Sequence, residues 1–290
     1  MNRRQFLAAT ALACATPLAF AQTNTRYKII GFTKPFQDLD HEQCADTVAE
    51  IGWDGIECPV RSKGQIELER AADELPKLIA ALKKRGKEIT LITTDIVKAD
   101  ASSQKLLRLA AQLGIKRYRL GALDYNLNKP IPPQVNEAAA AFRDIAVMNK
   151  ELGITGGVQN HSGADRFGCA IWDIWTAIKD LDPRHLGTIF DIGHATIEGG
   201  LSWPIEARLM EPHFVAIYVK DARMQKNPRA ARAEWVPLGE GLLGKAFFDW
   251  LKTTKFTGPI SHHAEYDHGK GKEMIAKLQK DMKVLRDWLS

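Results

Sequence analysis

Short apolar runs alternate with segments of helical periodicity along almost the whole chain. The apolar runs are rich in β-branched residues and have the length of buried strands, which predicts eight strands. Their predicted ranges are 27–32, 55–60, 89–94, 117–121, 155–160, 186–191, 214–220 and 259–265. The predicted helices between them are 41–51, 67–85, 104–113, 133–152, 169–181, 243–254 and 272–289.

A regular alternation of strand and helix is typical of a parallel sheet with helices packed against it. Eight such units predict an α/β fold of one domain, a closed (β/α)8 TIM barrel. The alternative is an open doubly wound sheet, which usually carries a glycine-rich phosphate-binding turn after its first strand. The turn found here, Gly31-Phe32-Thr33-Lys34-Pro35, is not of that type, so we expect the barrel.

The start of the chain interrupts this pattern and resembles an export signal. Arg3-Arg4 precedes an alanine-rich apolar segment, and small residues up to Ala21 suit cleavage. That segment is too short to span a bilayer. We expect a twin-arginine signal peptide over 1–21, a barrel domain over 22–290 with no transmembrane anchor, and a periplasmic or secreted location. A lipoprotein attached through Cys14 is the alternative.

Charge and cysteine content exclude further classes of protein. The formal net charge of +5 is small for 290 residues, so we expect no nucleic-acid partner. Cys44, Cys58 and Cys169 are scattered and show no CxxC spacing. We therefore infer neither a disulfide framework nor a cysteine zinc site.

Polar residues gather at the predicted carboxyl ends of the strands, where barrel enzymes place their active sites. Asp191 ends an apolar run, and His194 follows it after a glycine bend. This spacing brings a carboxylate and an imidazole together, or else Asp191 only caps the next helix. The other polar residues at strand ends are Glu57, Arg119, Gln159, Asn160, His161, Lys220, His263 and Glu265.

The alternation of side chains along a strand sorts these residues by face. Gln159 and His161 share one face of their strand. The adjacent residues His262 and His263 must point to opposite sides, so at least one of them is expected to pack in the core.

Taken in order, these motifs resemble the xylose isomerase-like family of barrels. The matching segments are Gly52-Trp53-Asp54-Gly55-Ile56-Glu57, Phe190-Asp191-Ile192-Gly193-His194, Val219-Lys220-Asp221, and Gly239-Glu240-Gly241 followed by Glu265. The family includes sugar isomerases and epimerases as well as zinc-dependent abasic-site nucleases. A nuclease needs a cluster of histidine ligands that is not found in this sequence.

The resemblance implies a metal site with altered ligands. In the family's epimerases Glu, Asp, His and Glu hold one metal ion, so Asp191 and Glu265 match as ligands and Glu265 also as a base. The resemblance makes His194 a substrate contact. Gln159 and Tyr218 replace the other Glu and the His. A Gln oxygen still binds a hard cation, but a phenol is a poorer zinc ligand than an imidazole. We therefore expect Mn²⁺ or Mg²⁺ rather than Zn²⁺, bound by Asp191, Glu265 and Gln159.

An amide at position 159 cannot take a proton, so another residue must supply the second acid or base. His161 is the first candidate. Lys220 is the second, either as a base of lowered pKa or as a cation that stabilises an enediolate. The alternative for Lys220 is a salt bridge to Asp191 or Glu265.

Four residues at the strand ends are predicted to bind substrate: Glu57, Arg119, Asn160 and His263. The alternative for Glu57 is an ion pair with Arg61 or Arg119. The basic segment 222–237 is predicted to be a surface loop or, alternatively, a lid over the substrate anchored by Trp235.

The expected function is that of a carbohydrate isomerase or epimerase that acts next to a carbonyl group through an enediolate, on a free or oxidised sugar. One alternative is a lyase or hydrolase that cleaves 3-keto-glycosides by β-elimination, which needs only one base. Another is a non-catalytic sugar-binding barrel, favoured by Gln159 and Tyr218. The expected partner is a small carbohydrate, and the sequence is compatible with an oligomer.

Overall fold

The computed structural model describes residues 26–225 and 232–290, and in this part of the chain eight parallel strands close into a barrel. The neighbours around the barrel are β1, β10, β7, β6, β5, β4, β3 and β2, with β2 pairing back to β1. The strands are β1 (Ile29–Phe32), β2 (Gly55–Pro59), β3 (Ile89–Thr93), β4 (Arg117–Arg119), β5 (Thr155–Gln159), β6 (Leu186–Asp191), β7 (Phe214–Val219) and β10 (Ile260–His262). The predicted TIM barrel is confirmed.

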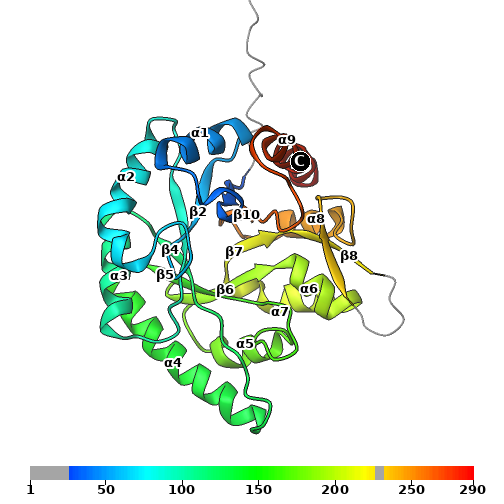
Figure 1. Ribbon diagram of the computed structural model, residues 1–290. Coiled ribbons are helices and arrows are strands. Elements are labelled where there is room, and N and C mark those ends of the chain that lie inside the picture. The colour runs from blue at the N-terminus through cyan, green and yellow to red at the C-terminus, as the bar shows by residue number, and fades with distance from the viewer. Residues whose placement is uncertain (1–25, 226–231) are drawn as a thin grey trace, which may run out of the picture.

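Helices form a ring around the strands (Figure 1). They are α1 (His41–Ile51), α2 (Ala71–Lys83), α3 (Ala101–Gln112), α4 (Ile131–Leu152), α5 (Trp172–Ile178), α6 (Ile192–Gly199), α7 (Trp203–Met210), α8 (Lys245–Thr253) and α9 (Gly271–Leu289). The last helix packs beside the first, so the two ends of the described chain close the ring. None of the described helices is long and apolar enough to cross a membrane.

Hydrophobic packing occurs in two separate places. The larger core lies between the strands and the helices, and the smaller one fills the inside of the barrel. The inner core consists of Ile30, Leu91, Ile189, Val215, Ala216 and Tyr218. This inner core closes the interior with side chains, so the barrel is a packed core rather than a pore.

Two helices between β6 and β7 are absent from the predicted helix ranges. Asp191 caps the first of them, α6, by accepting the backbone N–H of His194. Pro204 lies in the first turn of the second, α7, where a missing N–H costs nothing. The predicted signal peptide, with Arg3-Arg4 and Cys14, lies outside the described residues.

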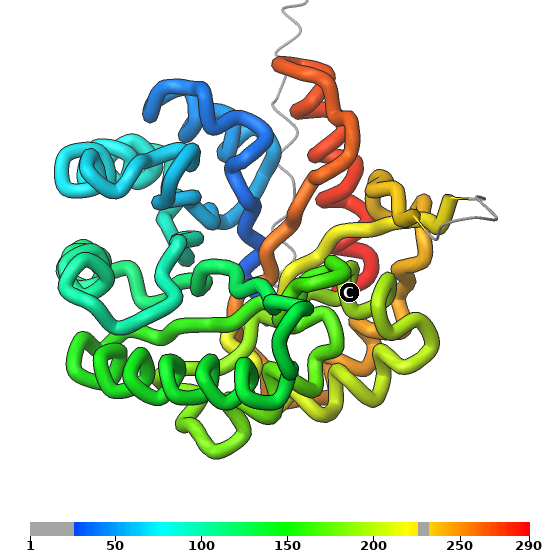
Figure 2. The backbone as a smooth tube through the Cα atoms, turned by 60° about the horizontal axis from the view of Figure 1, so that its bottom comes forward, coloured from blue at the N-terminus to red at the C-terminus, as the bar shows by residue number. Residues whose placement is uncertain are grey.

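The prediction of a loop over 222–237 is wrong at both ends of that segment. β8 (Asp221–Met224) and β9 (Ala233–Val236) form an antiparallel hairpin that stands out to one side of the barrel (Figure 2). The register pairs Asp221 with Val236 and Ala222 with Trp235, so the buried side chains of Ala222 and Val236 cover opposite faces of the hairpin at its base. Lys226 and Arg229 of this segment lie outside the described residues.

Asp221 holds the base of this hairpin. Its carboxylate accepts four backbone N–H groups, those of Ala222, Gly239, Gly241 and Leu243, at 2.8 to 3.0 Å. Residue 241 must be glycine for this approach, since a Cβ atom there would lie 2.3 Å from the Asp221 Oδ1 atom. The carboxylate therefore joins the hairpin to the turn that precedes α8.

We expect Asp221→Ala to lower the free energy of unfolding by about 2 kcal/mol or more, because it leaves several buried N–H groups without an acceptor. Urea denaturation followed by circular dichroism measures this loss. The matched control is Asp249→Ala, which removes a carboxylate exposed by 55% and paired with Lys252, and should cost less than about 0.5 kcal/mol. Equal stability of the two variants would contradict this role for Asp221.

Candidate active site

Asp191 lies at the centre of the site, and its two carboxylate oxygens have different partners. Oδ1 accepts the N–H of His194 at 3.0 Å and so caps α6. Oδ2 accepts a hydrogen bond from Gln159 Nε2 at 2.7 Å and lies 3.2 Å from Lys220 Nζ. Both roles that the sequence left open for Asp191, helix cap and site residue, are therefore present.

Lys220 lies between two carboxylates. Its Nζ atom is 3.2 Å from Asp191 Oδ2 and 3.0 Å from Glu265 Oε1, and its side chain is only 2% exposed. The indole ring of Trp235 covers the ammonium group at 4.7 Å. Residue 193 must be small here, since a Cβ atom on Gly193 would lie 2.5 Å from the Lys220 carbonyl oxygen. The salt bridge proposed as the alternative for Lys220 is present with both acids.

The charge of Lys220 controls its acidic neighbours. Burial alone would raise the pKa of Glu265, but the charges and hydrogen bonds of Lys220 and His263 together outweigh burial and hold that pKa well below its ordinary range. The same balance lowers the pKa of Asp191, with His194 as a further contributor. Both acids are therefore ionised at neutral pH.

Gln159 links this group to Arg119 on β4. The Arg119 Nη1 atom donates to Gln159 Oε1 at 2.6 Å, while Gln159 Nε2 donates to Asp191. Arg119 Nε is buried and has no hydrogen-bond partner in the described part of the chain.

Asn160, predicted to bind substrate, instead exchanges two hydrogen bonds with the backbone of Asp191 and is buried.

Glu57 forms a second centre inside the barrel, fully buried. Its carboxylate accepts from Tyr218 at 2.5 Å and Ser261 at 2.7 Å, also accepts from Thr93, and lies 2.9 Å from His263 Nε2. Neither Arg61 nor Arg119, the partners considered from the sequence, forms an ion pair with it in the described structure. Four protein groups contact the carboxylate, and the predicted substrate contact of Glu57 stays a prediction.

Glu57 and His263 each favour the charged form of the other. Burial alone would raise the pKa of Glu57, but the charge of His263 and a hydrogen bond to it prevail and lower that pKa to about 2. Burial also opposes the charge on His263, yet Glu57 raises the pKa of the imidazole. His263 Nδ1 lies 3.7 Å from Glu265 Oε1, so the pair connects Glu57 with the first group. His262 points the other way and contacts Asp281 of α9, as the alternation predicted.

Two further histidines lie beside Asp191, with their rings tilted by 37° to each other. The rings of His161 and His194 are 3.9 Å apart between centroids. His194 Nδ1 accepts the backbone N–H of Ser162 at 3.1 Å, and burial lowers the pKa of this imidazole to about 3. His161 Nδ1 lies 2.8 Å from the Ser162 carbonyl oxygen, and burial lowers its pKa as well. Both imidazoles are therefore neutral at pH 7.

A cavity of about 260 Å³ opens above these groups at the carboxyl ends of the strands. Among the polar side chains that line it are Arg61, Arg119, Gln159, His161, His263 and Glu265. Asp191, His194 and Lys220 lie behind this lining and contact it. The structure thus brings the predicted residues into one connected group, of which five line the cavity.

Several residues of the site were missed by sequence reasoning. Arg61 directly follows the second predicted strand, so the rule that sites lie at strand ends would have found it. Arg166 and Ser162 lie in the connection after β5, where no pattern marks them. Thr93 and Ser261 are small polar residues in apolar runs, and only the pairing of the strands reveals their common acceptor, Glu57.

The residues present do not fit a metal ion in this arrangement. The ammonium group of Lys220 lies between the two predicted carboxylate ligands. The Gln159 Oε1 atom accepts a hydrogen bond from Arg119, and the Tyr218 hydroxyl group donates one to Glu57. Across residues 26–225 and 232–290, no group of three or more His, Cys, Asp or Glu side chains is placed to hold an ion. We therefore derive no catalytic step through a metal, and the divalent ion stays a prediction.

The comparisons with known proteins agree with this fold. The family model of the xylose isomerase-like TIM barrel matches residues 45–288, and the chain belongs to this family. No curated protein matches the chain in sequence.

Solved structures resemble the chain at low sequence identity. The 3-keto-D-glucoside 4-epimerase of E. coli has a TM-score of 0.67 at 16% identity, covering 90% of this chain and 99% of that one. D-psicose 3-epimerase of Clostridium cellulolyticum has a TM-score of 0.70 at 12% identity, covering 91% and 99%. A probable 3-DHS dehydratase of Bacillus anthracis has a TM-score of 0.67 at 16% identity, covering 89% and 98%. These similarities establish the shared fold.

We expect Glu57→Gln to lower the free energy of unfolding by about 3 kcal/mol at neutral pH, because it removes the charge that His263 requires. The ordinary pKa of Glu57 is 4.5 and its folded value is about 2. Its contribution is therefore complete above pH 4.5 and disappears as the pH falls toward 2. Urea unfolding at neutral pH and at about pH 3 should show the difference from wild type shrinking in acid.

The control for this prediction is Glu151→Gln, which changes an exposed carboxylate on α4. It should alter the unfolding free energy by less than about 0.5 kcal/mol at either pH. A Glu57→Gln variant as stable as this control would show that the buried pair does not stabilise the fold.

A second prediction concerns Lys220 and the expected metal ion. Lys220→Met removes the ammonium group and leaves Asp191 and Glu265 facing each other, so a divalent cation gains a vacant position between two carboxylates. We expect Mn²⁺ to raise the melting temperature more in Lys220→Met than in wild type. Thermal unfolding with and without Mn²⁺ measures the shift, with the exposed Lys150→Met as control. Equal shifts in all three proteins would show that Lys220 and the ion do not compete.

Proposed function

We propose that this protein is a carbohydrate isomerase or epimerase that moves a proton at a carbon next to a carbonyl group. The observation that carries this proposal is the presence of two proton-transfer groups on one small cavity. Glu265 and His161 both line the space at the barrel mouth. Reactions of this class need a base to take a proton and an acid to return one.

Glu265 is suited to take the proton. Its side chain is 25% exposed, so a sugar in the cavity can reach the carboxylate. Burial would raise its pKa, but Lys220 and His263 together hold that pKa well below the ordinary range. Lys220 itself is nearly inaccessible, so we assign it a positioning role: it keeps Glu265 ionised and directed toward the cavity.

His161 is suited to supply the second group. A carbonyl oxygen only accepts hydrogen bonds, so the contact with Ser162 places the proton of His161 on Nδ1. The Nε2 atom then carries a free lone pair. Burial lowers the pKa of this imidazole, which keeps it neutral at pH 7 and able to take a proton. His161 thus replaces the carboxylate that Gln159 no longer provides.

The reaction follows from these positions. Glu265 or His161 takes the proton from the carbon next to the carbonyl group, and the electron pair of that C–H bond forms the C=C bond of an enediolate. The carbonyl oxygen becomes negative and faces a cavity wall that includes the guanidinium of Arg119. Return of a proton to the opposite face inverts the carbon, and return to the neighbouring carbon moves the carbonyl group.

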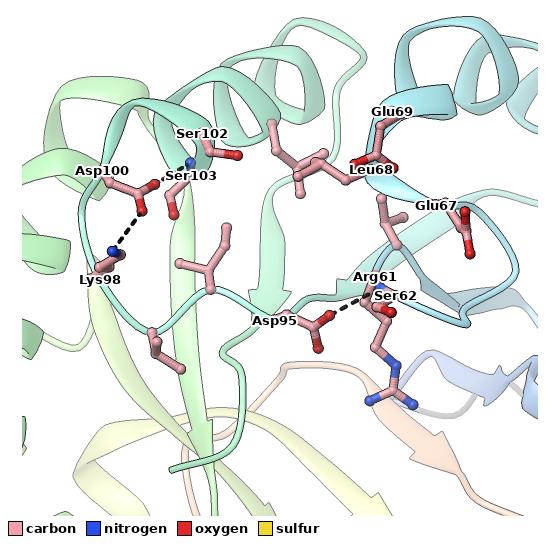
Figure 3. Close-up of a pocket in the computed structure, with 14 residues that line it drawn as sticks. Arg61, Ser62, Glu67, Leu68, Glu69, Asp95, Lys98, Asp100, Ser102 and Ser103 are labelled. Atoms are coloured by element: carbon pink, nitrogen blue, oxygen red, sulfur yellow. Dashed lines mark hydrogen bonds and ion pairs between the residues drawn. The ribbon is translucent and has the colours of Figure 1, made fainter.

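A lyase that cleaves 3-keto-glycosides is the second candidate, and a neighbouring cavity favours it. This cavity of about 340 Å³ lies between the loops that follow β2 and β3 and shares Arg61 with the first. Figure 3 shows Arg61 at its edge, pointing away from Leu68. A leaving group attached to a sugar in the first cavity would find room in the second, and the single carboxylate base would suffice.

We also propose that the protein is exported and acts in the periplasm or outside the cell. The twin-arginine pair Arg3-Arg4 and the small residues up to Ala21 support this location. No nucleic acid is expected among its partners, because the small net charge gives no basis for binding a duplex.

Glu265→Gln should slow proton transfer by about 10²- to 10⁴-fold, because an amide cannot accept a proton. The measurement is exchange of the hydrogen next to the carbonyl group in D₂O, followed by NMR over a panel of ketoses, aldoses and 3-keto-glycosides.

His161→Gln should slow epimerisation or isomerisation more than β-elimination, since elimination needs one base. Release of an aglycone identifies the lyase.

The matched control is Glu137→Gln, which alters an exposed carboxylate on α4 and should leave exchange unchanged. Circular dichroism confirms that each variant is folded. Undiminished exchange in folded Glu265→Gln would exclude this residue as the base. Absence of exchange by wild type over the whole panel, with sugar binding retained, would favour the non-catalytic sugar-binding barrel.

A further inference from the structure

The lining of the first cavity is unevenly charged. Lys34, Arg61, Arg119 and Arg166 contribute cationic groups, whereas Glu265 is the one carboxylate among the lining residues. These five residues come from four different connections and from β4, so the cluster is produced by the fold and not by a run of basic sequence. A neutral sugar gives no reason for such an excess.

Glu265 does not balance these cations, because Lys220 already binds it at 3.0 Å. The other nearby acids are also occupied. Glu57 is held by His263 and three hydroxyl groups, and Asp95 accepts the backbone N–H of Ser62 at 3.0 Å. None of these carboxylates forms an ion pair with Arg61 or Arg119 in the described residues.

Three arginines line this cavity, and two of them, Arg61 and Arg119, form no ion pair with an acid of the described residues. The Arg61 guanidinium makes no hydrogen bond there, and its nearest aromatic contact is the Phe32 ring at 6.0 Å. Arg119 donates one hydrogen bond to the neutral amide of Gln159 and keeps a buried Nε without a partner. Burial, together with the nearby charge of Arg119, lowers the pKa of Arg61. Asp95 and Glu57 oppose this shift without forming an ion pair, and two partly buried like charges become more favourable when an anion joins them directly.

Arg166 has a different status. Its Nη1 atom lies 3.0 Å from Asp124 Oδ1, on the outer side, while its Nε is buried without a partner. It adds to the positive potential of the cavity, and Asp124 holds its guanidinium in place.

We propose that the substrate carries an anionic group, a carboxylate or a phosphate, which Arg61 and Arg119 bind at the barrel mouth. This rests on the proposed function, which it makes more specific: the substrate is a sugar acid or a sugar phosphate. The planar guanidinium group matches both anions through paired hydrogen bonds. A volume of about 260 Å³ suits a monosaccharide of this kind. Binding the anion at one end fixes the position of the sugar relative to Glu265 and His161.

The test is isothermal titration calorimetry of the full chain with three probes that differ in charge: D-glucose, D-glucuronate and D-glucose 6-phosphate. We expect at least one anion to bind about tenfold or more tightly than glucose, with an affinity that falls as salt is added. The tighter of the two anions identifies the group. Glucose binding as well as both anions, or binding of neither anion, would overturn the proposal.

Arg61→Gln provides the matched variant, because this guanidinium holds no other residue and its removal should leave the fold intact. The preference for the anion over glucose should disappear in Arg61→Gln, because the affinity for the anion falls by about tenfold or more. Arg143→Gln, which removes an exposed arginine on α4, should keep the preference. An unchanged preference in Arg61→Gln would overturn the assignment.

This binding measurement separates the two proposals. Tight anion binding without any proton exchange would leave the anion site standing and remove the proposed function. Exchange on neutral sugars with no preference for anions would keep the proposed function and remove the anion site.

Discussion

The structure depends on an alternating series of charges that crosses the mouth of the barrel. From Glu57 the series passes through His263, Glu265 and Lys220 to Asp191, each acid lying against a base at 2.9 to 3.7 Å. Every member is at least partly shielded from water, so each charge is acceptable only because its neighbours have the opposite sign. The ionisation of Glu265 and the shape of the cavity both follow from this series.

The barrel itself was predictable because its signal is repeated. Eight apolar runs with helical segments between them leave few alternatives, and the ranges of β6 and α1 match the prediction at both ends. The hairpin β8–β9 was not predictable in the same way, because each of its strands has only four residues and its pairing is stabilised by Asp221, which lies at its base. Such a contact depends on tertiary structure rather than on periodicity.

The site was predictable in its membership but not in its connections. Asp191, Lys220 and Glu265 could be placed at strand ends by the fold rule alone. The sequence could not show that Lys220 would lie between the two acids, because three separate connections determine that distance. Ser261 was missed for a similar reason, since a single serine in an apolar run gives no indication of the acceptor it will meet.

The hydrogen bonds of Glu57 also limit how the chain can fold. Three of its partners, Tyr218, Ser261 and His263, are 161, 204 and 206 residues away along the chain. Until the final strand enters between β1 and β7, this acid has no imidazole beside it and favours water over the interior. During synthesis the amino-terminal half therefore lacks a stable buried centre of its own. The barrel is expected to close in a late step that requires nearly the complete chain, as long-range contacts generally slow folding.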